Sequence, residues 1–466
     1  MRHLILLALL AASAAAQLQP GKFLAITSGD ATQKSIRHLD RFAGTDTPLN
    51  VTGVDWKKYT PFDLFIEDEK NFLLAVTYSP LTGEDEGHLF RVTWDGQSKS
   101  WKATQLNTAP MVPRTVGVIR LKDTIYLSAG TAGNGSAHDA TLFQLPAKGG
   151  KPGVALALGK NCTPTPGPGN GTGGPIIAMG TTLHWFMWFG KATNGVEHWA
   201  VDTTQTPHVA KKVGNLPALA KRCSLPFLPV GICFDQASFL KAGGAMVIGS
   251  RTGDALWRDT SGNNLLHSAP PGQSTLPYTD LTESIAVNTD TGAVLMGDWN
   301  GTMEELTCGQ HGTWKLNVQA LNMSSGAWVQ ALKYIPAGST YRKNSNGCPH
   351  PNQVYPCSYL NSLPVPGNLD FQLTLESPGI FAVVLFGLTS SSKNLGGWGA
   401  PGCWLHPSLA TGVILPGTGQ KGGFALKAPI PATMQRGWFA HVQWLVTDPK
   451  ANALGLVVSD SRLLTF

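Results

Sequence analysis

Residues 284–321 read SIAVNTDTGAVLMGDWNGTMEELTCGQHGTWKLNVQAL, and this stretch decides the fold. It contains four short runs of apolar and β-branched residues: SIAVN, AVLMG, TMEELTC and TWKLNVQAL. Between them stand turn-forming segments rich in Gly, Asp, Asn and Thr, which predict tight connections. Four strands joined by tight turns predict one blade of a β-propeller.

The same unit recurs along the chain, each time as a strand that ends in a small or polar turn. The six anchor strands are FLAITSG (23–29), FLLAVTYS (72–79), TIYLSAG (124–130), LHWFMWFG (183–190), AMVIGSRTG (245–253) and AVLMGDWNG (293–301). Their spacing is about 50–60 residues, close to the ~40–50 of propeller blades. The sequence therefore predicts an all-β, six-bladed β-propeller over residues 17–337.

The first repeat lacks a strand before FLAITSG, whereas an additional strand, AWVQALKYI (327–335), follows the sixth repeat. We expect this late strand to complete blade one and close the ring, because closure removes exposed sheet edges. Seven blades remain an alternative, since residues 140–175 are rich in Gly and Pro and hard to divide into strands. A β-sandwich or a solenoid in place of the propeller is a second alternative.

Residues 338–354 are polar and contain prolines, which indicates a linker that Cys348 could pin. The remaining segment, 355–466, has short strands of its own, including FQLTLES, FAVVLFGL and AHVQWLVTD. Several short strands in one compact segment predict a C-terminal β-sandwich.

Composition excludes several classes of protein. The 466 residues carry a formal net charge of +6, and only 14% are charged, against ~25% in ordinary soluble domains. The hydrophobic fraction of 42% supplies a large core and argues against disorder. Lys and Arg are scattered, so nucleic acid is not an expected partner.

The N-terminus predicts export. Arg2 and His3 precede the apolar run 4–12, and small residues lead to Ala16. This pattern is typical of a secretory signal peptide covering residues 1–16. The apolar run is shorter than the ~20 residues that span a bilayer. We expect a secreted, cell-surface or periplasmic protein without a transmembrane segment.

Export favours disulfides for the seven cysteines, although spacing alone does not give their connectivity. Cys223 and Cys233 flank a short Pro-rich segment and form the first expected pair. Cys357 and Cys403 both lie in the last segment and form the second. One of Cys162, Cys308 and Cys348 should then be free.

The last ~110 residues resemble a C-terminal domain of large secreted bacterial proteins that carry a β-propeller. The resemblance rests on NLDFQLTLES, on LGGWGAPGCWL and above all on the tail AHVQWLVTDPKANALGLVVSDSRLLTF. It implies extracellular or surface display and no catalytic residue, and it supports the pairing of Cys357 with Cys403. CSYLNSLPVPG stands where family members more often have a Gly- and Cys-rich start.

Acidic residues near strand ends are the weak catalytic candidates. A glycosidase needs two facing carboxyl groups, and Glu283 and Asp298 are expected neighbours at the propeller channel. Asp298 and Asp254 are also candidate ligand-binding residues. The interpretation that we favour for Asp298 is a turn former, because Asp side chains hydrogen-bond to their own turn.

Tryptophans offer a second possible ligand surface, because aromatic rings stack on sugars. Trp299 lies in the GDWNG turn and is a candidate ligand-binding residue, whereas Trp257 lies in a related turn. For Trp185 and Trp188 we favour packing between blades, since both faces of LHWFMWF are apolar.

Metal and cofactor motifs are weak. Cys308, His311, Cys348 and His350 could bind zinc in principle, but a Cys308–Cys348 disulfide is favoured in an exported chain. No cofactor or metal is expected, because GNGTGG (169–174) lies between Pro-rich turns and no helix follows it.

Two functions remain open. The first is an exported, non-enzymatic binding or structural protein whose propeller face binds a glycan or protein ligand. The second is a carbohydrate-active hydrolase or lyase on the same fold, since propellers host both uses.

Overall fold

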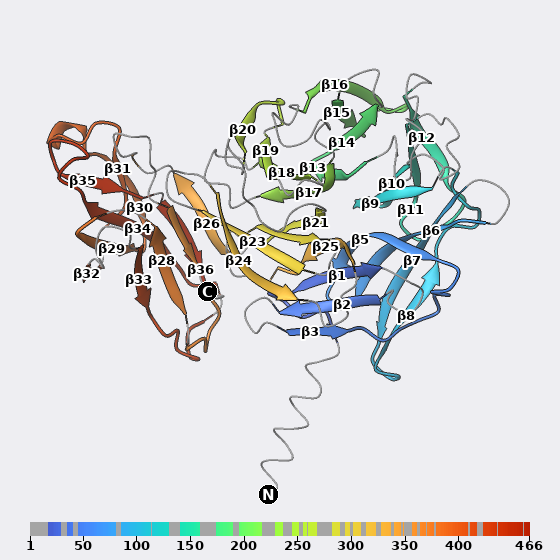
Figure 1. Cartoon of the computed structure of the whole chain (residues 1–466), viewed down its shortest axis with the longest axis horizontal. Coiled ribbons are helices and arrows are strands. Elements are labelled where there is room, and N and C mark those ends of the chain that lie inside the picture. Colours follow the sequence, from blue (N-terminus) through green and yellow to red (C-terminus); the bar gives the residue numbers. More distant parts are fainter. Residues whose placement is uncertain are drawn as a thin grey trace, which may run out of the picture.

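The computed structural model is an all-β protein of two parts (Figure 1). It describes residues 17–28, 35–40, 45–80, 85–112, 114–129, 140–158, 174–189, 195–216, 229–235, 245–250, 255–258, 260–267, 282–288, 294–298, 302–308, 314–322, 328–336, 340–345, 348, 357–360, 364–369, 371–376, 379–408, 411–416, 423–435, 437–459 and 461–466.

Six sheets, antiparallel apart from the short parallel β4–β8 pair, form the blades of a propeller, which confirms the predicted fold and blade number. Blade one contains β25 (Trp328–Tyr334), β1 (Phe23–Ser28), β2 (Ser35–Asp40) and β3 (Thr45–Pro48). Blade two contains β5 (Thr60–Asp68), β6 (Asn71–Tyr78), β7 (Glu86–Asp95), β8 (Ser100–Gln105) and the short β4 (Val51–Thr52). Blade three contains β9 (Thr115–Leu121), β10 (Thr124–Ala129), β11 (Thr141–Pro146) and β12 (Gly153–Ala157).

The other three blades follow the same plan of four consecutive strands. Blade four contains β13 (Ile176–Met179), β14 (Thr182–Phe189), β15 (Gly195–Asp202) and β16 (Val209–Asn215). Blade five contains β17 (Pro229–Asp235), β18 (Ala245–Ser250), β19 (Ala255–Arg258) and β20 (Asn264–His267). Blade six contains β21 (Thr282–Val287), β22 (Val294–Asp298), β23 (Thr302–Cys308) and β24 (Trp314–Asn322).

The inner strands of the blades form a closed ring. Each of β25, β5, β9, β13, β17 and β21 contacts the next, and β21 contacts β25 again. The late strand β25 pairs antiparallel with β1, so that Phe23 opposes Tyr334. The strand predicted at 327–335 therefore does complete blade one.

The strands inside the blades are apolar on both faces because each blade lies between two others. In β6, Phe72, Leu74 and Val76 pack in a core shared with blade one. Leu73 and Ala75, on the opposite face, pack against blade three. Double coverage explains why FLLAVTYS is a continuous apolar run and does not alternate.

The C-terminal part is a β-sandwich. Its larger sheet has the order β26 (Thr340–Ser345), β36 (Ser461–Thr465), β34 (Phe439–Thr447), β29 (Phe381–Gly387) and β32 (Thr411–Pro416), with β35 (Leu456–Val458) beside β34. Its smaller sheet contains β27 (Cys357–Leu360), β28 (Gln372–Glu376) and β33 (Gly423–Lys427). A core around Trp444, Phe371 and Leu373 fills the space between them. A separate hairpin contains β30 (Ser390–Asn394) and β31 (Trp404–Pro407).

The prediction of a linker at 338–354 is wrong for residues 340–345. Residues 340–345 form β26, which pairs with β36 at the edge of the larger sheet, so that Thr340 opposes Thr465. The polar sequence TYRKNS suggested a loop. An edge strand is held by its backbone hydrogen bonds and needs no apolar side chains.

Cys348 forms a disulfide with Cys403. The predicted pairing of Cys403 with Cys357 is therefore wrong, as are the Cys308–Cys348 disulfide and the zinc set that used Cys348. Both sulfurs lie in a buried cluster with Leu395, Ala400 and Val457. The backbone of Cys348 also bonds to Val458, which places it beside the hairpin that carries Cys403. Strand pairing, rather than closeness along the chain, brings the two thiols together.

Candidate functional site

A polar cavity of about 550 Å³ opens between the turns of blades two and three. Its lining residues are Glu67, Asp68, Asn71, Arg91, Arg120, Asp123, Pro146, Ala147 and Lys148. They come from β5, β6 and β7 of blade two and from β9, β11 and two turns of blade three. None of these residues is aromatic, so hydrogen bonds rather than stacking would hold a ligand there.

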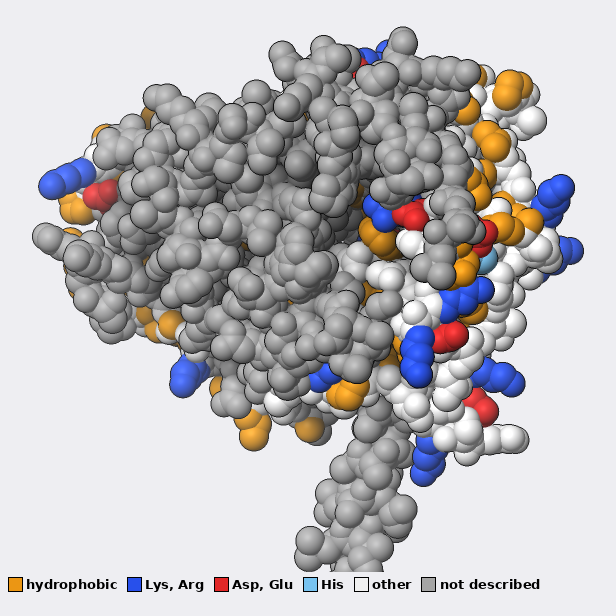
Figure 2. Space-filling view, turned by 45° about the vertical axis from the view of Figure 1, so that its right-hand side comes forward, with side chains coloured by type: hydrophobic (Ala, Val, Ile, Leu, Met, Phe, Trp, Pro, Cys, Tyr) orange, Lys and Arg blue, Asp and Glu red, His pale blue; other side chains and the backbone are white. Residues whose placement is uncertain are grey.

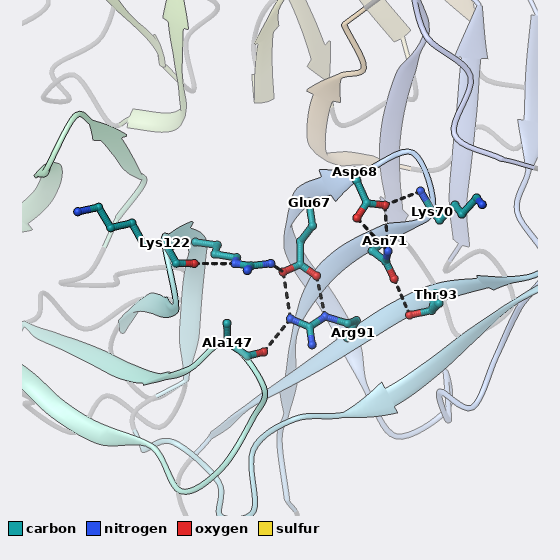
Figure 3. A network of polar contacts seen from close by, with 9 residues as sticks. Glu67, Asp68, Lys70, Asn71, Arg91, Thr93, Lys122 and Ala147 are labelled. Atoms are coloured by element: carbon teal, nitrogen blue, oxygen red, sulfur yellow. Dashed lines mark hydrogen bonds and ion pairs between the residues drawn. The ribbon is translucent and has the colours of Figure 1, made fainter.

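The β5–β6 turn forms one wall and is fixed by its own side chains. An Asp68 carboxylate oxygen accepts the backbone N–H of Lys70 at 2.7 Å. The amide of Asn71 donates to both Asp68 oxygens, at 2.9 and 3.0 Å. Asn71 in turn accepts the Thr93 hydroxyl at 2.8 Å. Figure 3 shows this chain of bonds from the turn to β7.

Glu67 ties the two blades together. Its carboxylate receives two bonds from Arg91, Nε to Oε2 at 2.6 Å and Nη2 to Oε1 at 3.0 Å. Arg120 of blade three donates Nη1 to Oε1 at 2.6 Å. The Glu67 side chain is only 4% exposed, so these charge-assisted bonds replace its lost hydration.

Backbone carbonyls of blade three anchor both guanidinium groups. Arg91 Nη2 donates to the carbonyl of Ala147 at 2.7 Å. Arg120 Nε donates to the carbonyl of Lys122 at 2.8 Å. We call Glu67, Arg91 and Arg120 the arginine clasp. Figure 3 labels Glu67 and Arg91 of this group, with Lys122 and Ala147 beside them. The clasp presets the cavity wall, which lowers the ordering cost of binding.

The cavity wall is chemically mixed. Three lining residues are acidic and three are basic, so the formal charges cancel. Figure 2 shows the same mixture on the visible described surface, where Lys and Arg lie close to Asp and Glu. Such a wall offers donors and acceptors together, which suits a ligand with hydroxyl groups.

A second polar group lies at the opposite end of blade two. Arg114 pairs with Asp85 at 3.3 Å and lies over the ring of Phe62. Burial lowers the pKa of Arg114. Burial also lowers the pKa of His88, whose Nε2 lies 3.0 Å from Glu86. Asp85 and Arg114 immediately precede β7 and β9, so these contacts hold the starts of the two strands together.

A buried imidazole chain connects blades four and five. Arg258 Nε donates to His198 Nδ1 at 3.3 Å, and His198 Nε2 lies 2.9 Å from His184 Nδ1. Because arginine only donates, His198 carries its proton on Nε2 and donates it to His184. Burial lowers the pKa of His184 to about 4, so His184 is neutral near pH 7.

The predicted acids lie on adjacent strands of blade six. Glu283 belongs to β21 and Asp298 ends β22, where Thr282 is the register partner of Asp298. The side chains of both acids lie outside the described residues, as do residues 254 and 299 entirely. Their catalytic and ligand-binding roles remain predictions.

The other predicted residues have different outcomes. Trp185 is fully buried and packs against blade three, which confirms its packing role. The side chains of Trp188 and Trp257 lie outside the described residues. So do Cys223 and the side chain of Cys233, and their pairing remains a prediction.

The arginine clasp was not predicted from the sequence. Its three members are spread over residues 67–120 and come together only through blade packing. A signal does exist, because FDLFIED, HLFRVTW and GVIRL each place a charged residue inside an apolar strand. Such residues need partners when they are buried.

No protein-family model and no curated protein matches the chain. Solved structures give only distant likenesses. A Bacteroides thetaiotaomicron protein of unknown function is 10% identical, with 69% of this chain and 87% of that chain covered and a TM-score of 0.38. The RRP9 WD40 repeats are 11% identical, with coverages of 60% and 86% and a TM-score of 0.33. An exo-β-1,3-galactanase from Phanerochaete chrysosporium is 9% identical, with coverages of 96% and 100% and a TM-score of 0.36. At TM-scores this low, none of them carries an argument.

The described part of the chain contains no helix whose length and hydropathy would let it cross a bilayer. It also contains no group of three or more His, Cys, Asp or Glu side chains placed to hold a metal ion. Residues 1–16, the predicted signal peptide, lie outside it.

Proposed function

We propose that this protein is an exported carbohydrate-binding protein, and that the cavity between blades two and three holds the sugar. The observation that carries the proposal is the polar wall fixed by the arginine clasp. Its volume falls within the ~300–1,000 Å³ typical of ligand pockets. Its donors and acceptors match sugar hydroxyls, which do both.

The acids of the cavity favour binding over hydrolysis. A glycosidase needs one protonated carboxyl group and one free carboxylate. Both oxygens of Glu67 accept hydrogen bonds from arginines, so neither is free to act on a substrate. Both oxygens of Asp68 hold the β5–β6 turn. Asp123 is the remaining acid in the lining.

Export is part of the proposal. The signal-peptide pattern at 1–16 and the buried Cys348–Cys403 disulfide support it, because structural disulfides persist in oxidising compartments. The resemblance of the C-terminal part to secreted bacterial proteins points the same way. Mass spectrometry of the processed protein should give an N-terminus at Gln17.

A glycan array tests the binding proposal, with the processed full-length chain as the probe. The cavity variant is Asp123→Ala with Lys148→Ala, two exposed side chains that make no hydrogen bond or ion pair within the described residues. The control is Trp299→Ala, at the surface that the sequence analysis predicted. We expect the cavity variant to lose at least tenfold in affinity while the control retains binding.

Other results have clear meanings. Loss of binding only in Trp299→Ala would move the sugar site to blade six and refute the cavity. No binding by the native chain would refute the carbohydrate proposal.

The hydrolase remains the alternative function because Glu283 and Asp298 lie on adjacent strands. Release of reducing ends from an array ligand, abolished by Glu283→Gln, would establish it.

A further inference from the structure

The arginine clasp leaves donors without acceptors. Arg91 uses three of its five N–H groups, one toward each Glu67 oxygen and one toward Ala147. Arg120 uses two, toward Glu67 and Lys122. Five guanidinium N–H groups therefore have no acceptor in the described structure, although both residues line the cavity.

The clasp also has unbalanced charge. Two guanidinium groups share one carboxylate, which leaves the clasp with a formal charge of +1. Arg91 and Arg120 have side chains 24% and 35% exposed, so both are accessible from the cavity side. One further carboxylate would balance the charge and accept from both planar forks.

The rest of the lining requires a different group on the same ligand. Asp68 and Asp123 would repel a compact dianion but accept hydroxyl protons. Lys148 supplies another donor. A molecule with a carboxylate at one side and hydroxyl groups at the other matches both halves of the wall.

We propose that the ligand is an acidic saccharide whose carboxylate binds Arg91 and Arg120 and whose ring hydroxyls bind the Asp123 side. This inference rests on the proposed carbohydrate-binding function and names its ligand class. Arg120 is the specificity residue, because it binds the carboxylate of the ligand. It can also be substituted while Arg91 keeps its two bonds to Glu67.

The test compares a galacturonic acid tetrasaccharide with its methyl ester, in which uncharged ester groups replace the carboxylates. Titration calorimetry of the processed full-length chain should give at least tenfold tighter binding of the acid at low salt. Added salt should weaken binding of the acid and leave binding of the ester unchanged. Only the acid binds through a charge, and salt screens that interaction.

Two variants locate the effect. Arg120→Gln should lose at least tenfold for the acid and less than threefold for the ester. Lys102→Gln removes the same charge from an exposed position of β8 outside the cavity lining and should change neither. If Arg120→Gln lowers the melting temperature of the protein, Lys148→Gln is used as the second variant. The Lys148 side chain is exposed and makes no hydrogen bond or ion pair within the described structure.

The outcomes separate the two proposals. Equal binding of acid and ester would overturn the acidic-saccharide inference and leave sugar binding intact. The acid could still bind more tightly than the ester in both Arg120→Gln and Lys148→Gln. That result would place the carboxylate elsewhere and would also overturn the acidic-saccharide inference. If neither probe nor any arrayed glycan binds, both the carbohydrate-binding function and the acidic-saccharide inference are refuted.

Discussion

The propeller and the β-sandwich differ in how many large apolar side chains they expose to solvent. In the described propeller, the large apolar residues classed as exposed are three valines: Val112, Val154 and Val209. The described part of the sandwich exposes ten, and five of them are aromatic: Leu369, Ile380, Phe381, Leu388, Trp398, Trp404, Val413, Ile414, Trp438 and Phe439. Each blade is covered by two others, whereas part of the larger sandwich sheet faces outward.

The two parts also differ in how they are held together. The described blades two and three share a buried ion-pair cluster, the arginine clasp. The sandwich has a covalent link, Cys348–Cys403, that ties its entering segment to the β30–β31 hairpin. A ring of packed blades distributes its stability over many interfaces, while the smaller sandwich combines its apolar core with this crosslink.

Removal of the disulfide should give the largest effect. The crosslink closes a segment of 55 residues, so Cys348→Ser with Cys403→Ser should cost the sandwich about 4 kcal/mol. Calorimetry of the full-length chain should show a lower melting temperature for the sandwich and little change for the propeller. Cys357→Ser is the control, and an equal loss there would contradict the observed pairing.

Acid should destabilise the propeller through its buried imidazoles. His184 has a folded pKa of about 4, below the ~6.5 of an unfolded histidine. The unfolded state therefore takes up the proton first, and stability is lost as the pH falls from 6.5 toward 4. The loss should reach about 3 kcal/mol below pH 4. Urea unfolding at pH 7 and pH 4.5 should show a smaller difference in His184→Gln than in the native chain. An unchanged difference would contradict the assigned burial.

Loss of the clasp carboxylate should be intermediate in size. Glu67→Gln leaves Arg91 and Arg120 without their shared acceptor charge and should lower propeller stability by about 2 kcal/mol. The arginines are partly exposed, which limits the effect. Thermal unfolding measures it, and Glu86→Gln, on the same blade but more exposed, serves as the control. A larger loss in the control would show that the clasp does not stabilise the blades.

A surface change on the sandwich should have the smallest effect on stability. Ile414 is 71% exposed on strand β32, so Ile414→Thr should change the free energy of unfolding by less than ~0.5 kcal/mol. It should reduce binding of a hydrophobic dye, because exposed apolar area attracts such probes. Val154→Thr in the propeller is the matched control and should alter dye binding less.

Sequence patterns predicted the fold better than the site. The six anchor strands and the closing strand each have a local pattern of apolar residues, and that pattern alone predicts a strand. The edge strand at 340–345 was missed because its polar side chains carry no such pattern. The partner of Cys403 and the grouping of Glu67 with two arginines depend on pairing between distant segments. Spacing along one chain does not encode those contacts.

The closing strand β25 has a consequence for synthesis of the protein. Phe23 in β1 pairs with Tyr334, 311 residues later in the chain. At ~5–20 residues per second, a ribosome needs roughly 15–60 s to supply the missing strand. During that interval β1 has an unpaired inner edge, and such edges invite aggregation. We therefore expect nascent chains that end before residue 328 to be protease-sensitive and to depend on chaperones, whatever the stability of the finished ring.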